Sequence, residues 1–246
     1  IIVMAVPRAR AAVAAELFPD RPQLSVIIPV LNESDCLDRN LARLFALPYI
    51  QRHCEVILCD GGSSDQSIEI ATRYPCRIER SEAGRALQMN RGASVARAPL
   101  LLFLHADTAL PADIGAQLRQ DMQWGFFRLR LNHEAAAYRV IETAINWRSR
   151  ITRVAGGDQA LIFASDFFHA LGGFAPIPLM EDIAICKAAR RLSAPLMLQS
   201  PVTSSSRRWQ NHGLVKTIVL MWSLRLAYWL GVSPVRLHRF YYPQQG

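Results

Sequence analysis

Acidic residues are missing from the last quarter of the sequence, which has no Asp or Glu between Ile183 and Gly246. The whole chain has 246 residues and a formal net charge of +8. Its first 182 residues are close to neutral, so the positive charge is concentrated in this final segment. The segment holds nine basic residues: Lys187, Arg190, Arg191, Arg207, Arg208, Lys216, Arg225, Arg236 and Arg239. Such one-sided charge predicts an anionic partner, either a phosphorylated substrate, a lipid surface or a nucleic acid.

Cysteine pairs with the spacing of a metal or redox motif are also missing. The chain has five cysteines, an odd number, and no CxxC. We therefore expect neither a disulfide framework nor a zinc site, and interpret the cysteines as reduced core residues of a cytoplasmic protein. The apolar start of the chain has no basic segment before it, so a signal peptide is not expected. Residues 1–23 are interpreted as an N-terminal extension.

The phosphate-binding loops of two large enzyme classes are missing as well. The sequence has neither the GxGxxG of dinucleotide-binding folds nor the GxxxxGK[ST] of P-loop proteins. What it does have is an alternation of apolar strand-like runs with helical segments. The predicted strands are Ser25–Val30, Glu55–Asp60, Cys76–Arg80 and Leu100–Leu104. Four strands joined by helices predict an α/β fold with a doubly wound, mainly parallel sheet in one large domain.

Further elements are predicted with less regular spacing. Ser63 and Gln66 have the spacing of a capping box that would begin a helix ending near Tyr74. After residue 111 the predicted strands are Phe126–Leu131 and Asp158–Ala164, and the predicted helices are His133–Val154, Asp166–Leu171 and Glu181–Leu192. The last of these begins with two acids and ends with basic residues, which suits the helix dipole.

Acidic residues follow the predicted strands or begin a loop. Asp60 and Asp107 each follow a strand, and the carboxyl ends of parallel strands meet at the edge where ligands bind. A carboxylate at the end of a buried strand is costly unless it binds a metal or pairs with a charge. Asp107 therefore has two interpretations, a metal or charge partner or the cap of a helix after Pro111. Glu181 and Asp182 are likewise either site acids or ordinary acids in a first helical turn.

Six motifs in order resemble one enzyme family. They are SVIIPVLNE, EVILCDGGSSDQS, GR…MNRGA, LLLFLHADT, GGF…MED and SRRW, between Ser25 and Trp209. Each motif alone is weak, but their order and spacing resemble the family-2 glycosyltransferases with the GT-A fold. The sequence is similar to a small bacterial group that carries LHADT in place of the usual DxD.

The resemblance implies a role for each matching residue. The implied nucleotide-sugar ligands are Pro29, Asn32, Glu33, Asp60, Gly61, Arg85, Asn90, Arg207, Arg208 and Trp209. Asp107, with His105, matches the motif that binds the divalent metal, Mn²⁺ or Mg²⁺. Asp182, next to Glu181, matches the acid that deprotonates the acceptor hydroxyl. One base, one metal and no covalent nucleophile imply an inverting, hexosyltransferase-like enzyme.

The sequence departs from the family pattern at three positions. His105 stands where the first acid of DxD is usual, Gly61 replaces the second acid of the common DDGS, and Leu31 replaces a frequent aromatic. Because imidazole can bind Mn²⁺, we hypothesise that His105 assists Asp107 and favours Mn²⁺ over Mg²⁺. The alternative is a hydrogen-bonded histidine at a strand end.

The chain is divided by this interpretation into a glycosyltransferase domain and a helical segment. Residues 24–111 would bind the nucleotide sugar. Residues 112–210 would form the catalytic half, with the acceptor near 126–158. Residues 211–246 would form an amphipathic helical segment. In the helix predicted at Gly213–Gly231, one apolar side contains Val215, Ile218, Val219, Trp222, Leu226, Trp229 and Leu230. Arg225 in its middle argues against a membrane span. Docking on the core and weak association with an anionic membrane both stay open.

Two other function classes remain as rivals. A sugar-nucleotide pyrophosphorylase shares a similar core, but would be expected to have a basic, Gly-rich loop after the first strand, where this chain has VLNES. A non-catalytic protein with a degenerate site would use its basic end to dock on a membrane or a nucleic acid. The aromatic and basic residues of Arg236–Tyr242 give the nucleic-acid version slight support, but we do not expect that partner.

Overall fold

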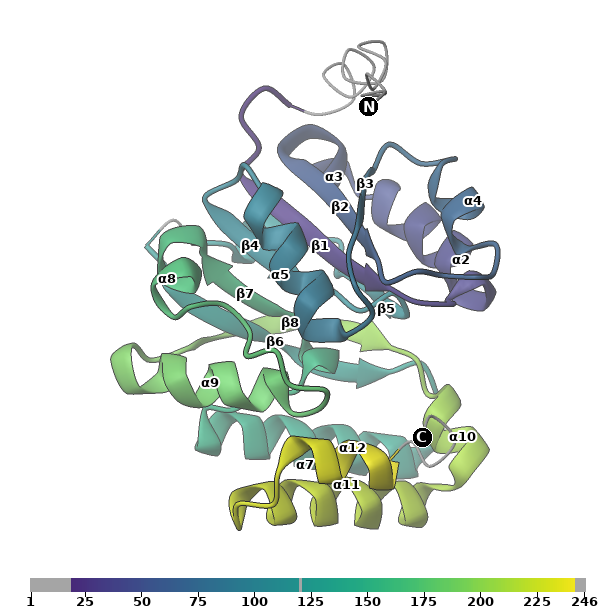
Figure 1. Cartoon of the computed structure of the whole chain (residues 1–246), viewed down its shortest axis with the longest axis vertical. Helices are drawn as coiled ribbons and strands as arrows, with labels where there is room; N and C mark the ends of the chain where they lie inside the picture. The colour runs from purple at the N-terminus through teal and green to yellow at the C-terminus, as the bar shows by residue number, and fades with distance from the viewer. Residues whose placement is uncertain (1–18, 120, 242–246) are drawn as a thin grey trace, which may run out of the picture.

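A computed structural model describes residues 19–119 and 121–241, so most of the predicted N-terminal extension lies outside the described residues. One eight-stranded sheet runs through the molecule in the order β3-β2-β1-β4-β7-β6-β8-β5. Helices cover both of its faces (Figure 1). The predicted α/β class is confirmed.

The first half of the sheet is parallel, as the sequence predicts. It contains β1 (Leu24–Val30), β2 (Cys54–Asp60), β3 (Arg77–Arg80) and β4 (Leu100–Phe103). β1 pairs in parallel with both β2 and β4, and β2 pairs in parallel with β3. β2 and β4 are buried along their whole length, which explains their continuous apolar sequences.

Four helices connect these strands: α2 (Ser34–Phe45), α3 (Pro48–His53), α4 (Ser67–Ala71) and α5 (Arg85–Val95). The predicted capping box at Ser63 and Gln66 is wrong. The residue before α4 is Gln66 itself, and it makes no side-chain capping bond. The Ser63 hydroxyl instead accepts the Asn32 N–H at 3.0 Å, so a long-range bond replaces the local one.

The second half of the sheet is mixed. Its strands are β5 (Thr108–Ala109), β6 (Trp124–Leu131), β7 (Leu161–Ala164) and β8 (Leu196–Ser204). β7 is antiparallel to β4 and β6, whereas β6 and β8 are parallel. The helices are α6 (Ile114–Gln117), α7 (Ala136–Thr152), α8 (Ser165–Ala170) and α9 (Glu181–Leu192). The strand predicted from Asp158 begins three residues later, because Gly157–Gln159 form a 3-10 turn, η1.

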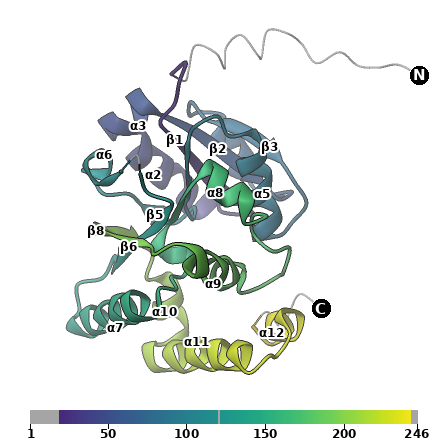
Figure 2. The ribbon, with the colours of Figure 1, turned by 90° about the vertical axis from the view of Figure 1, so that its left-hand side faces the viewer.

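Three helices end the described chain: α10 (Arg207–His212), α11 (Leu214–Trp229) and α12 (Pro234–Tyr241). Figures 1 and 2 show α11 and α12 on the side of the molecule where α7 lies. α11 docks on the core through Thr217 and Leu224, which are buried. Most of the side that the sequence predicts as apolar does not supply this contact, because Trp222 and Leu226 are exposed, although Ile218 packs partly against the first core cluster.

The core consists of two apolar clusters, one on each face of the sheet. Val26 and Ile28 of β1 belong to one cluster and Ile27 to the other, as the alternation of a strand requires. Leu224 and Leu237 belong to the second cluster, so α11 and α12 are part of the folded core. Among the described residues, no helix is long and apolar enough to cross a membrane.

Candidate active site

The loops after β1 and β2 are tied to each other by side-chain hydrogen bonds. Asn32 Oδ1 accepts the Ser64 N–H at 2.8 Å, and Asp60 Oδ1 accepts the Ser63 N–H at 2.9 Å. Asn32 has φ 55°, a left-handed conformation that asparagine tolerates better than most residues. Gln88 of α5 donates to the Val30 carbonyl at 2.7 Å and so fixes the end of β1. The predicted ligands Asn32, Asp60 and Gly61 therefore lie together on a preformed edge.

The loop after β4 carries the predicted metal ligands His105 and Asp107. Asn40 of α2 donates to the Ala106 carbonyl at 2.6 Å and holds the loop against the first half of the sheet. Thr108 Oγ1 lies 3.3 Å from Asp107 Oδ1. Both predicted ligands are half-buried at the carboxyl edge, where the sequence analysis expected them.

Asp182 and His105 contact the same residue, Gly157. The Gly157 N–H donates to Asp182 Oδ2 at 2.7 Å. A Cβ at Gly157 would lie 2.5 Å from His105 Nε2, so a larger residue there would displace the ring. Residue 157 thus has to be small for the loop after β4 to approach the start of α9. This contact brings the predicted base next to the predicted metal loop.

The backbone is strained where α9 begins. Met180, the residue before α9, has φ 71°, which costs a non-glycine residue about 1–3 kcal/mol. Glu181 is buried and pairs with Arg85 Nη1 at 3.5 Å. Burial, and in smaller part the Asp182 charge, raises the pKa of Glu181, while Arg85 opposes the shift. Glu181 therefore holds Arg85 in place rather than facing a reactant.

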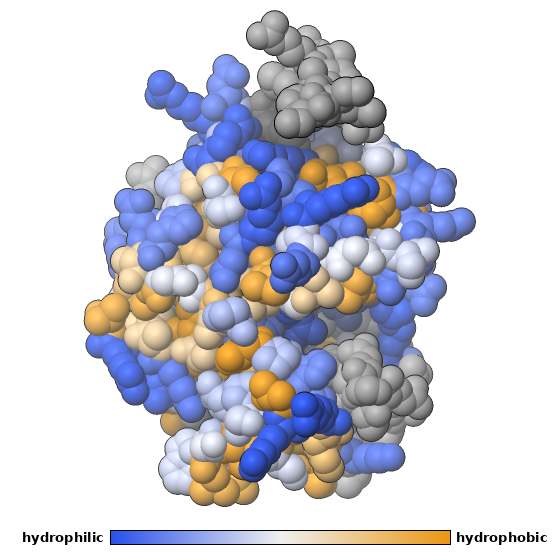
Figure 3. All heavy atoms as spheres, in the orientation of Figure 1, coloured by the Kyte–Doolittle hydropathy of each residue, from blue (hydrophilic) through white to orange (hydrophobic). Residues whose placement is uncertain are grey.

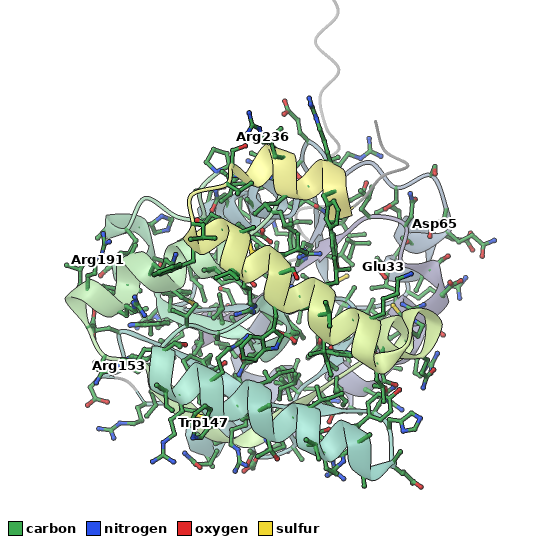
Figure 4. All side chains as sticks on the ribbon, turned by 90° about the horizontal axis from the view of Figure 1, so that it is seen from below. Glu33, Asp65, Trp147, Arg153, Arg191 and Arg236 are labelled. Carbon is green, nitrogen blue, oxygen red and sulfur yellow. The ribbon has the colours of Figure 1, made fainter. Side chains whose placement is uncertain are left out.

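Arg207 lies across the loop after β1. Its guanidinium nitrogens are 3.9 Å from a Glu33 carboxylate oxygen and 3.7 Å from one of Asp35. Burial raises the pKa of Glu33, with a further contribution from Asp107, whereas Arg207 and Arg85 lower it. The Glu33 pair is partly exposed and the Asp35 carboxylate is largely exposed, so both pairs are weak and an anion can exchange for them. Figure 4 shows Glu33 on the same side of the molecule as Asp65.

Four other predicted nucleotide-sugar ligands are Asn90, Trp209, Arg208 and Pro29. Asn90 does not face this edge, because its amide donates to and accepts from the Phe174 backbone at 2.8 and 2.9 Å. Trp209 packs partly against the first core cluster. The Arg208 side chain lies outside the described residues. Pro29 stays within β1, opposite Cys59 of β2.

A charged cluster behind Gly157 was not predicted from the sequence. Asp158 of η1, Arg148 of α7 and Arg225 of α11 influence one another electrostatically. Burial raises the pKa of Asp158, and the two arginines oppose that shift. Burial and the Arg225 charge lower the pKa of Arg148 to about 10. Within the described ranges, the Arg148 Nε is buried without a hydrogen-bond partner.

Arg225 reaches this cluster from the C-terminal helix. One of its guanidinium nitrogens would be 3.3 Å from a Cβ at Gly156. The sequence did contain a signal for this cluster, namely an arginine in the middle of an apolar helix. That arginine was interpreted only as an argument against a membrane span. The same residue next to the buried Leu224 also indicates a charge directed into the protein, because an inward-facing arginine needs a partner.

The residues at this edge fit a divalent cation that binds together with a diphosphate. In the part of the chain that the structure describes, no group of three or more His, Cys, Asp or Glu side chains could hold a metal by itself. Mg²⁺ is usually bound through one or two carboxylates plus substrate phosphates. The half-buried Asp107 carboxylate could supply one such ligand, and His105 lies two residues before it in the same loop.

Comparison with known proteins finds one matching family. The model of glycosyl transferase family 2 matches residues 25–122. The matched segment contains β1 to β5 and therefore the predicted ligands from Pro29 to Asp107. The resemblance to this family is thus supported over the first half of the chain, and the assignment to the LHADT group stays a prediction.

Two curated relatives are glycosyltransferases by name. A validoxylamine A glucosyltransferase of Streptomyces hygroscopicus subsp. jinggangensis is 36% identical over 90 residues, which are 34% of this chain and only 21% of the relative. An undecaprenyl-phosphate 4-deoxy-4-formamido-L-arabinose transferase of Edwardsiella ictaluri is 26% identical over 236 residues, 87% of this chain and 69% of the relative. The chain therefore spans about a fifth of the first relative and about two thirds of the second.

A solved structure establishes the fold. The mannosyltransferase of Pyrobaculum calidifontis, in complex with GDP-Man and Mn²⁺, superposes with a TM-score of 0.59 at 18% identity. The superposition covers 97% of this chain and 71% of that chain. The GT-A fold predicted from the sequence is confirmed, because the likeness extends beyond the segment that the family model matches.

Proposed function

We propose that this protein is an inverting glycosyltransferase that moves a sugar from a nucleotide-diphospho-sugar to an acceptor hydroxyl with the help of a divalent cation. The observation that carries the proposal is the contact of Gly157 with both Asp182 and His105. It puts a half-buried carboxylate without a covalent role next to the loop of Asp107. Family 2 relatives and the nucleotide-sugar complex of the mannosyltransferase support the same conclusion.

The donor is assigned to the preformed edge. Asn32, Asp60 and Gly61 would face the nucleoside, since their loops are fixed before any ligand binds. Arg85 and Arg207 would contact the diphosphate, because guanidinium groups bind phosphate oxygens in bidentate geometry. When bound, a cation held by Asp107 would neutralise the charge that develops on the departing diphosphate. The ring of His105 would lie beside that carboxylate.

Asp182 is assigned the role of general base. One carboxylate oxygen accepts the Gly157 N–H and the other the Ile183 N–H, each at 2.7 Å. Each oxygen keeps a second lone pair for a proton. As the acceptor oxygen bonds to the anomeric carbon, its proton passes to Asp182. The bond from that carbon to the diphosphate breaks, and its electron pair leaves with the nucleoside diphosphate. A single displacement of this kind inverts the anomeric centre.

The remaining expectations are part of the same proposal. Residues 24–111 would serve the donor and residues 112–210 the catalysis, with the acceptor near 126–158. All five cysteines are free, which supports work in a reducing compartment such as the cytoplasm. The pyrophosphorylase alternative is disfavoured because the loop after β1 presents Asn32 and Glu33 rather than a basic, Gly-rich sequence.

The proposal is tested first by donor binding. UDP-, GDP-, CDP- and dTDP-sugars are screened by thermal shift with and without Mn²⁺, since a ligand that binds only the folded state raises its apparent stability. At least one donor is expected to stabilise the protein, more strongly with metal. Stabilisation by none of them, at concentrations up to millimolar, would contradict a sugar-nucleotide enzyme.

The second test isolates the base. Asp182→Asn is expected to bind the selected donor as the wild type does and to lose about 10²–10⁴-fold in the rate of transfer or donor hydrolysis. Asp166→Asn, which changes an acid at the start of α8, serves as the matched control and should keep the full rate. Equal rates in Asp182→Asn and wild type would exclude this role for Asp182.

A further inference from the structure

Exposed apolar side chains gather on one side of the molecule. Of the thirteen large apolar side chains that are exposed in the described part of the chain, eleven belong to α7, α11, α12 or the turn between α11 and α12. We call these eleven residues the apolar face: Val140, Trp147, Ile151, Val219, Trp222, Leu226, Trp229, Leu230, Val232, Val235 and Phe240. Single exposed apolar residues are ordinary, whereas a group of this size marks an interaction surface.

The three helices form one continuous side of the protein. Figures 1 and 2 both place α7, α11 and α12 at the end opposite the N-terminal strands. Seen from below, α11 lies between α12 and α7, on which Trp147 is labelled (Figure 4). Apolar residues also appear at the bottom of the space-filling view, over α11 and α12 (Figure 3). The apolar face is therefore a surface built from several elements rather than one irregular helix.

α11 is apolar on two opposite sides. Thr217 and Leu224 are buried against the core, while Trp222 and Trp229 are 64% and 72% exposed. A helix that is apolar on every side is usually buried on every side. The protein core covers one side of α11, so the other side requires a second apolar partner.

The charge around the apolar face indicates which partner covers it. Glu142 is the one acidic residue within α7, α11 and α12, and it is buried and paired with Arg139 at 2.8 Å. Exposed basic residues surround the apolar face: Arg150, Lys216, Arg236 and Arg239. A second copy of the chain would bring these like charges together, which disfavours self-association. Tryptophans bordered by basic residues are instead typical of helices that lie at an anionic lipid interface.

We propose that the apolar face docks on the surface of an anionic lipid bilayer, with α11 and α12 lying in the interface. Among the described residues no helix is long enough to cross the bilayer, so the attachment is peripheral. This proposal does not depend on the proposed enzymatic function. Arg225 reaches Gly156 from α11. Docking of α11 would therefore bring the loop of Gly156 and Gly157 within ~10 Å, the diameter of a helix, of the lipid headgroups.

The experiment measures vesicle binding of the whole chain by co-sedimentation. Vesicles of phosphatidylcholine alone are compared with vesicles containing phosphatidylglycerol. The wild type is expected to bind the anionic vesicles and to lose binding as salt is raised. Trp222→Gln/Trp229→Gln should weaken binding about tenfold or more, because two large aromatic side chains no longer insert. Arg236→Gln/Arg239→Gln should weaken it about fivefold for each charge removed.

The matched control is Leu192→Gln. Leu192 is 71% exposed, like the two tryptophans, but lies at the end of α9, outside the apolar face. It should bind vesicles as the wild type does. Thermal unfolding and donor binding of all variants are expected to be unchanged, which separates a docking defect from misfolding and from failure of the proposed function.

Three results would overturn the proposal. The first is no binding of the wild type to anionic vesicles, and the second is equal loss of binding in the tryptophan variant and in Leu192→Gln. The third is a wild type that forms a dimer without lipid, shown by sedimentation equilibrium, with the dimer abolished by Trp222→Gln/Trp229→Gln. The last result would assign the apolar face to a second copy of the chain.

Discussion

The two halves of the candidate site are built on different principles. At the ends of β1 and β2, polar side chains accept hydrogen bonds from backbone N–H groups: Asn32 accepts the Ser64 N–H and Asp60 the Ser63 N–H. Behind Gly157, the charges of Asp158, Arg148 and Arg225 act on one another without short ion pairs, and the Arg148 Nε lacks a partner in the described chain. The first half thus satisfies its backbone donors locally, whereas the second half gathers charges that are only partly paired.

Asp65 of the first half and two acids of the second half differ in the direction of their pKa shifts. Asp65, in the loop after β2, loses a little solvation, but hydrogen bonds from Ser67 and Ser34 outweigh this and lower its pKa. Glu181 and Asp158, in the second half, have raised pKa values because burial outweighs their cationic neighbours. Burial also raises the pKa of Glu33 in the first half, so the contrast holds for Asp65 and not for every acid of its half. Ionisation of Asp65 therefore stabilises the fold, whereas ionisation of Glu181 and Asp158 destabilises it.

The largest effect is expected from removing the carboxylate where the two halves meet. Asp107→Ala should lower transfer about 10²–10³-fold and abolish the extra thermal stabilisation that Mn²⁺ gives to the donor complex. The control is Asp113→Ala, which removes an exposed acid whose partner is the Ser200 hydroxyl at 2.6 Å. If metal dependence survives in Asp107→Ala, the cation site does not lie between the halves.

The rigidity of the first half is tested at the opposite end of β2. Glu55 is 2% exposed and accepts the Ser25 hydroxyl at 2.6 Å and the Arg97 Nε–H at 3.0 Å. Glu55→Ala should lower the free energy of unfolding by about 3 kcal/mol, because buried donors lose their acceptor. Urea unfolding measures this. Glu69→Ala, which breaks an exposed pair with Arg73, should cost under about 1 kcal/mol. Equal costs would contradict a buried network.

The dependence of the second half on α11 is tested at Arg225. Arg225→Met should lower kcat about tenfold, because the charged cluster behind Gly157, the residue that contacts Asp182, loses a cation. It should also raise the pKa of Asp158 further, since this cation opposes the upward shift. Lys216→Met, a change of an exposed cation on the same helix, should alter neither quantity. An unchanged kcat in Arg225→Met would show that Arg225 is structural only.

The smallest effects are opposite pH dependences in the two halves. The Asp65 pKa is lowered from 3.8, so its contribution to stability is present above pH 3.8 and is lost as pH falls through the folded-state pKa. The deficit of Asp65→Asn relative to wild type should therefore shrink in acid.

Glu181 is expected to behave in the reverse way. Its pKa is raised above 4.5, so the wild type loses stability as pH rises from 4.5 through the folded-state pKa. The advantage of Glu181→Gln over wild type should grow across that range. Denaturant unfolding at several pH values measures both differences, and the same sign in both variants would refute the contrast between the halves.

The parallel strands and the edge residues could be predicted because their signals are local. Continuous apolar sequences such as Leu100–Phe103 indicate strands that are buried on both faces, and the acids that follow them lie at the carboxyl edge by geometry alone. The wrong capping box at Ser63 failed for the opposite reason. Its hydroxyl pairs with Asn32, 31 residues away, and no short spacing reveals such a partner.

The α/β class, the positions of Asp60 and Asp107 and the basic, acid-free C-terminal quarter follow from the amino-acid sequence alone, since each depends on composition or on short-range periodicity. The tertiary structure decided which side of α11 contacts the core, that Arg225 and Arg148 join Asp158, and that Asn90 supports the Phe174 backbone. Periodicity can identify the apolar sides of a helix such as α11. Which of two apolar sides faces the protein depends on long-range packing, and here that packing places Leu224 inside and Trp222 outside.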